Sequence, residues 1–143
     1  MTVKQYLQQI RTLKRNIERR RDSIDETFVT MQMISSPSLE ERVQTSPRDR
    51  MPELAAKLDS EEAKLKIEIE RETDLIIRIS QQIAGLRASD NEKDVLHLRY
   101  IMCKPWAEII DVMGYTDRRV YQLHGTALQA FGRQYLKDFS EFQ

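Results

Sequence analysis

The chain has 143 residues, and helix-forming Glu, Lys, Arg, Gln, Leu and Ile dominate a composition with only four glycines and four prolines. Its 23 basic and 23 acidic residues give a net charge of zero, which excludes a basic footprint spread over the whole chain. A single cysteine excludes an internal disulfide, and we find neither a signal-peptide core nor an apolar run of membrane-spanning length. We therefore expect an all-α, cytoplasmic protein.

The first segment, from Thr2 to Met33, predicts an amphipathic helix. Apolar residues recur every seven positions at Ile10, Ile17, Ile24 and Met31. Leu13 occupies the second core position of the heptad, whereas the next such position is the charged Arg20, so the coiled-coil seam is narrow and imperfect. The run from Arg19 to Arg21 has two interpretations: a phosphate-binding patch, or a solvated face whose Arg stems cover the seam. The acidic residues around it favour the second.

Residues 34–52 interrupt the helical pattern. They contain three prolines and four serines, and proline disfavours helix in the residue before it. We expect a long, partly ordered connection there. It is either a functional loop or a flexible tether between two helices.

The second long helix is predicted from about Met51 to Leu86. Two rows of residues spaced by seven form its apolar stripe: Leu58, Leu65, Glu72, Ile79 and Leu86 in one, and Glu62, Ile69, Ile76 and Ile83 in the other. A helix of ~35 residues is about 50 Å long and needs a partner along its apolar face. That partner is either the first helix, folded back as an antiparallel hairpin, or a second copy of the chain, and both arrangements can hold at once.

Three short helices are predicted after Ser89. Ser89 and Glu92 have the spacing of a capping box, which starts a helix over residues 90–102. The second helix begins at Pro105 and runs through Met113, where Gly114 favours a left-handed closing residue. Thr116 can cap the third helix, which continues past residue 131. The chain thus divides into a helical hairpin over residues 1–88 and a three-helix domain over residues 89–143.

The turn from Gly114 to Thr116 has the length and the leading glycine of a helix-turn-helix. In that motif the N-terminal residues of the third helix enter the major groove of DNA. The candidate DNA-binding residues are Lys104, Thr116, Asp117, Arg118, Arg119, Tyr121 and Gln122. Arg pairs with guanine and Gln with adenine, while Lys104 would lie near phosphates. The alternative is a three-helix bundle with an ordinary polar exterior.

The C-terminal segment resembles region 4 of bacterial sigma factors. The positions that carry the resemblance are Leu96, Arg99, Tyr100, Ile109, Gly114, Thr116, Val120, Ala127 and Leu128. The resemblance implies that Asp117, Arg118, Arg119, Tyr121 and Gln122 match the positions that read the −35 promoter element. Asp117 and Tyr121 stand where a basic residue is common in that region.

The whole layout, a helical hairpin with a Ser/Pro-rich connection (RVQTSP) before the helix-turn-helix, resembles a phage and prophage family of sigma-like factors and late-gene regulators of the ArpU and RinA types. The resemblance implies an activator of late phage genes in a bacterial cell. Its partners would be double-stranded DNA, RNA polymerase, and a second copy of the chain bound through the coiled coil. Three alternatives stay open: a true sigma factor, the small subunit of a DNA-packaging machine, and a protein-interaction adaptor. The first lacks a promoter-melting domain, since residues 1–88 have only Tyr6 and Phe28 as aromatics.

No pattern indicates an enzyme. Cys103 has no neighbouring base and is interpreted as a small core residue, and His97 and His124 lack the spacing of metal ligands. We find no phosphate loop, nucleophile elbow or metal motif, so we expect no catalytic residue, metal or cofactor.

Overall fold

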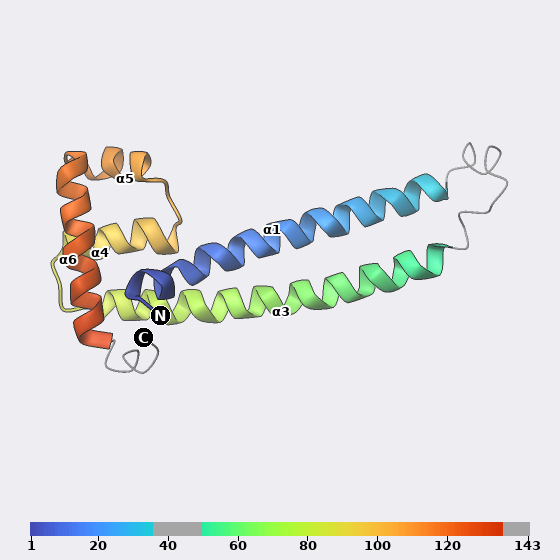
Figure 1. The fold of residues 1–143 in the computed structure, drawn as a ribbon, viewed down its shortest axis with the longest axis horizontal. Helices are drawn as coiled ribbons and strands as arrows, with labels where there is room; N and C mark the ends of the chain where they lie inside the picture. Colours follow the sequence, from blue (N-terminus) through green and yellow to red (C-terminus); the bar gives the residue numbers. More distant parts are fainter. Residues whose placement is uncertain (36–49, 136–143) are drawn as a thin grey trace. The chain divides into compact units, whose positions relative to one another are not determined.

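The computed structural model describes residues 1–35 and 50–135, and all regular elements in these ranges are helical, which confirms the all-α prediction. In chain order they are α1 (Val3–Ile34), α3 (Met51–Ala84), α4 (Asp90–Leu96), the π-helical turn η2 (His97–Ile101), α5 (Trp106–Met113) and α6 (Asp117–Tyr135) (Figure 1). The predicted connection over residues 34–52 lies for the most part outside the described residues. At its edges, Ile34 still belongs to α1 and Pro52 already belongs to the first turn of α3, where proline is tolerated.

The chain forms two compact units. Unit 1 consists of residues 1–12 and 72–143, and unit 2 consists of residues 13–71. This division differs from the predicted boundary at residues 88–89. The reason is that Tyr6, Leu7 and Ile10 of α1, together with Ile79 and Ile83 of α3, are buried in the same core as the C-terminal helices.

In unit 2, segments of α1 and α3 contact each other along a seam, which we define as the side of each helix that faces the other. On α1 the most buried seam residues are Ile17, Thr27 and Ile34. Because Thr27 donates its hydroxyl to the Ser23 carbonyl at 2.9 Å, its polar group is satisfied within the helix.

The α3 seam corrects two positions of one predicted row, whose other members, Ile76 and Ile83, are half-buried and buried as predicted. Glu62 and Ile69 are exposed, and the neighbouring Glu61 and Glu68 lie in the seam instead. Heptad spacing alone is compatible with either pair in the seam: Glu62 and Ile69, or Glu61 and Glu68. The choice is made by Arg20, which occupies the seam of α1 and draws the two carboxylates inward.

Arg20 binds both glutamates. Its Nη1 lies 2.8 Å from Glu61 Oε2, and its Nη2 lies 2.8 Å from Glu68 Oε1, with exposed side-chain fractions of 24% for Arg20, 17% for Glu61 and 16% for Glu68. Hydrogen bonding to Glu68 is the largest cause that raises the pKa of Arg20. Arg19 and Arg21 are exposed. Arg20 is therefore paired within the seam, which neither interpretation of the arginine run predicted for this residue, whereas the exposure of Arg19 and Arg21 agrees with a solvated face.

The core of unit 1 joins the first turns of α1, the last turns of α3 and the short helices. Its buried members are Tyr6, Leu7, Ile10, Ile79, Ile83, Leu86, Leu96, Tyr100, Ala127, Ala130 and Phe131. The Phe131 ring lies 6.0 Å from the Tyr6 ring and 4.8 Å from the Tyr135 ring, centroid to centroid. The end of α6 is also tied to the end of α3, because Tyr135 donates to the Gln82 carbonyl at 2.6 Å. These contacts hold α6 at a defined position in the unit.

Candidate nucleic-acid interface

The turn between α5 and α6 is built as its sequence predicts. Gly114 is left-handed, with φ of 71°, and its N–H donates to the Ile110 carbonyl at 3.0 Å. Thr116 Oγ1 accepts a hydrogen bond from the Arg119 N–H at 3.2 Å, as an N-cap does. The predicted roles of both residues at the helix ends are therefore confirmed.

Helix α6 has one buried and one exposed side. The buried side is formed by Val120, Leu123, His124, Ala127, Ala130 and Phe131. On the exposed side, the predicted DNA-binding residues Asp117, Arg118, Tyr121 and Gln122 line one shallow depression. Asp117 Oδ1 accepts from the Arg118 N–H at 2.8 Å, so its carboxylate is engaged at the helix N-terminus. The depression thus presents a carboxylate, a guanidinium, a phenol and an amide.

Trp106, at the start of α5, supports this surface from beneath. Its ring meets Tyr121 edge-on at 5.2 Å and His124 edge-on at 4.7 Å. The guanidinium of Arg99 lies 4.6 Å from the Trp106 ring centroid, within the range of a cation–π contact. Arg99 also donates to the Lys104 carbonyl at 3.1 Å. Tyr121 is therefore held from one side although it is exposed on the other.

A buried hydrogen bond joins η2 to α6. The Tyr100 hydroxyl and His124 Nε2 are 2.7 Å apart. Burial raises the pKa of Tyr100 to about 12, and burial together with the nearby Lys4 and Arg99 charges lowers that of His124 to about 4. Both groups are consequently neutral near pH 7. The spacing argument left His124 without a role, and its position next to Leu123 on the apolar stripe was the signal that could have indicated one.

The segment before α5 departs from the predicted continuous helix over residues 90–102. Helix α4 ends at Leu96 and is followed by the π-helical turn, in which the Met102 N–H donates to the His97 carbonyl at 3.0 Å. Cys103 then takes a left-handed conformation with φ of 54°, and it is half-buried against the core. This backbone geometry directs Arg99 toward Trp106 and Tyr100 toward His124. The helix propensities of these residues do not predict it.

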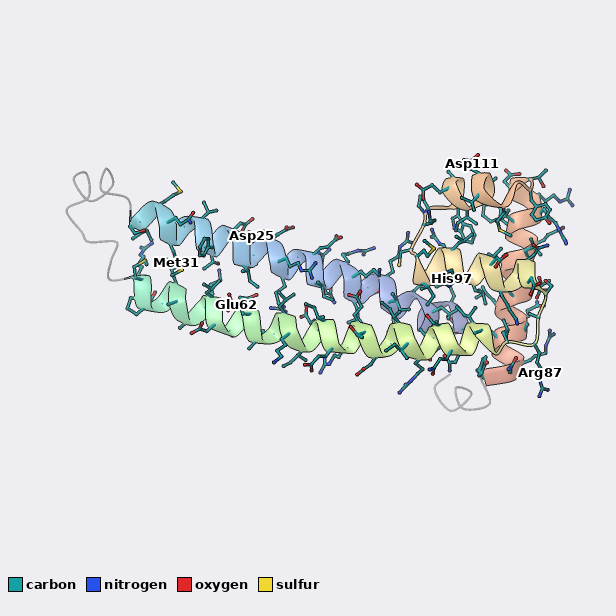
Figure 2. All side chains as sticks on the ribbon, turned by 180° about the vertical axis from the view of Figure 1, so that it is seen from behind. Asp25, Met31, Glu62, Arg87, His97 and Asp111 are labelled. Atoms are coloured by element: carbon teal, nitrogen blue, oxygen red, sulfur yellow. The ribbon has the colours of Figure 1, made fainter. Side chains whose placement is uncertain are left out.

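The remaining predicted site residues lie apart from the depression. Arg119 is exposed on α6 but does not line it, and Thr116 serves as the cap. Lys104 precedes α5, and its ammonium lies 3.7 Å from the Glu108 carboxylate. Figure 2 labels His97 on η2 and Asp111 on α5, and both side chains are exposed. The structure therefore brings together four of the seven predicted residues.

Within residues 1–35 and 50–135, no group of three or more His, Cys, Asp or Glu side chains could hold a metal ion. In the same ranges, none of the helices has an apolar stretch long enough to cross a bilayer. Comparison of the chain with protein-family models, with curated proteins and with solved structures finds no match.

Proposed function

We propose that this protein is a sequence-specific DNA-binding regulator of transcription that reads duplex DNA with the N-terminal turns of α6. The observation that carries the proposal is the depression lined by Arg118, Tyr121 and Gln122, on a helix that follows a three-residue turn and is held from behind by Trp106. In a helix-turn-helix the N-terminal residues of this helix are the ones that enter the major groove.

The chemistry of the exposed groups suits base edges. The Arg118 guanidinium can donate to O6 and N7 of guanine, and the Gln122 amide can pair with N6 and N7 of adenine. The Tyr121 ring offers an apolar edge beside them. Asp117 adds a carboxylate to the same depression, and its Oδ1 accepts a hydrogen bond from the Arg118 N–H.

The target we propose is promoter DNA of phage or prophage late genes, with RNA polymerase as a second partner. The sigma region 4 pattern, including Arg99, Gly114, Thr116 and Val120, supports this choice. Three of these positions have a structural role in this chain: Gly114 and Thr116 form the turn, and Val120 is fully buried. We propose no enzymatic activity and no cofactor.

Replacing Arg118 or Gln122 by alanine is expected to weaken binding to a selected duplex by about 1–3 kcal/mol each, which corresponds to roughly 5- to 150-fold. Both side chains are exposed, so the unfolding transition should not move. The measurement is a low-salt gel-shift titration with the duplex enriched from a random library and with DNA from upstream of phage late genes. Arg71→Ala, an exposed arginine of unit 2, is the matched control. If both variants bind like the control, α6 is not the recognition helix.

Unit 2 supplies a reason to propose self-association. Phe28, Val29 and Met33 of α1 are 52%, 51% and 57% exposed. Val29 and Met33 lie one turn apart on one side of the helix, where a second copy can cover them. We expect the double substitution V29S/M33S to lower the mass measured by multi-angle light scattering toward that of a monomer, with Met102→Ser in unit 1 as control. A ring of many copies for the unaltered chain would instead favour the DNA-packaging alternative. A monomer would exclude both that alternative and the self-association proposed here.

A further inference from the structure

The indole ring of Trp106 is held by contacts from two other elements of unit 1. The Arg99 guanidinium of η2 lies 4.6 Å from the ring centroid, and Arg99 itself donates to the Lys104 carbonyl at 3.1 Å. From α6, the His124 ring meets the indole edge-on, with an interplanar angle of 73°. His124 is in turn fixed by its 2.7 Å hydrogen bond with the Tyr100 hydroxyl. The position of the indole is therefore set by the fold, before any ligand binds.

Tyr121 lies between this fixed indole and the depression on α6. Its ring centroid is 5.2 Å from that of Trp106, with an interplanar angle of 67°, and its side chain is 49% exposed. The same side chain lines the depression together with Asp117, Arg118 and Gln122. Ordering a side chain costs free energy when a ligand binds, and a ring that already rests on a neighbour has less freedom to lose. Tyr121 is thus oriented in the free protein.

An oriented aromatic ring in the major groove has one apolar group to contact. The base edges there present hydrogen-bond donors and acceptors, and the only apolar group among them is the C5-methyl of thymine. Arg118 and Gln122 suit the polar edges of guanine and adenine, whereas most of the exposed surface of a phenol ring is apolar carbon. Gln122 follows Tyr121 directly in the chain. Because thymine pairs with adenine, the amide and the ring can act on the same or on neighbouring A·T base pairs.

We propose that Tyr121 selects thymine by packing its ring against the C5-methyl group, and that Trp106 is the positioning residue that holds the ring for this contact. The inference rests on the proposed function and deepens it, because it names a base that the α6 surface reads and the residue that sets the reading geometry. Arg99 and His124 act on Tyr121 only through Trp106. Specificity at this base pair therefore depends on a residue of α5 as well as on α6.

The test replaces each thymine of the enriched duplex, one at a time, by deoxyuridine, which lacks only the methyl group. At the thymine that contacts Tyr121, this change should weaken binding of the full chain about fourfold, the effect of one methyl group losing an apolar contact. Tyr121→Ala should bind the thymine and uracil duplexes equally. Tyr121→Phe should keep the fourfold ratio, because the methyl group contacts the ring and not the hydroxyl. Tyr115→Ala, at an exposed tyrosine in the turn before α6, is the matched control and should also keep it.

The positioning role of Trp106 is tested by the same ratio of affinities for the thymine and uracil duplexes. Trp106→Leu keeps an apolar side chain but removes the ring that supports Tyr121, so the ratio should fall toward one. Trp106→Phe supplies a ring again and should restore most of the ratio. A variant that only destabilised the fold would lose affinity for both duplexes by the same factor and would leave the ratio unchanged. The ratio therefore distinguishes positioning from a general structural effect.

The outcomes separate this inference from the proposed function. The inference is overturned if no thymine of the enriched duplex is sensitive to loss of its methyl group, or if the duplex contains no thymine. It is also overturned if the sensitive thymine stays equally sensitive in Tyr121→Ala, or if Trp106→Leu keeps the full ratio. In each of these cases the proposed function stands as long as Arg118→Ala weakens selective binding. If the unaltered protein selects no duplex from the library at low salt, both proposals fail.

Discussion

Replacement of Phe131 by alanine is expected to lower the free energy of unfolding of unit 1 by about 3–5 kcal/mol. The Phe131 side chain is fully buried, and its ring contacts Tyr6 of α1 and Tyr135 of α6. Alanine would leave a cavity at the point where the three parts of the core meet. Urea titration followed by the fluorescence of Trp106, the single tryptophan, reports unit 1 specifically.

The same titration of Val112→Ala is the control. Val112 is 62% exposed on α5, so its loss should change the free energy of unfolding by less than about 0.5 kcal/mol. A Phe131→Ala effect as small as that of Val112→Ala would show that the core does not join α1 to α6. The Phe131 variant should also lose DNA binding under conditions in which part of unit 1 is unfolded.

The second large expected effect is a loss of stability at acidic pH caused by His124. Burial lowers its pKa in the folded protein to about 4, below the ordinary value of 6.5. Between these two pH values the unfolded chain binds a proton that the folded chain does not. The stabilising contribution is therefore complete above pH 6.5 and is lost as the pH falls toward 4, by about 3 kcal/mol at most.

His124→Gln separates this titration from that of the carboxylates. Glutamine places a neutral polar group near the position of Nε2 and can keep a hydrogen bond to the Tyr100 hydroxyl. The difference in free energy of unfolding between the two proteins should change between pH 6.5 and pH 4.5, and should be constant above pH 7. Trp106, whose ring meets His124 at 4.7 Å, should also lose fluorescence in the folded protein as the imidazole becomes charged. A pH-independent difference would place the pKa of His124 at its ordinary value.

The ends of the short helices were predictable because they depend on local chemistry. Ser89 Oγ accepts from the Glu92 N–H at 3.3 Å, as the capping spacing predicted. Gly114 is left-handed and Thr116 caps α6 for equally local reasons. In each case the residue and its partner are at most four positions apart. Both residues of each interaction therefore lie within a few positions of each other, so a short stretch of sequence is enough to predict it.

The support behind the α6 surface could not be predicted in this way. Tyr100 and His124 are 24 residues apart, and their contact depends on the π-helical turn and on the left-handed Cys103. The spacing of residues along the chain gives no partner for His124. The same limit applies to the seam of unit 2. Heptad spacing allowed Glu62 and Ile69 where the structure has Glu61 and Glu68, because the deciding residue, Arg20, lies on another helix.

The ion-pair network of Arg20 also restricts how the two long helices can be aligned. Sliding α3 by one heptad in either direction would replace Glu61 or Glu68 by Leu54 or Leu75 beside the guanidinium. One carboxylate would then remain in the seam without its cation, which is unfavourable for a group withdrawn from water. The apolar repeats tolerate such slips, since one isoleucine or leucine replaces another. Arg20 therefore specifies the register of the two helices, because only one offset between them places both glutamates beside its guanidinium.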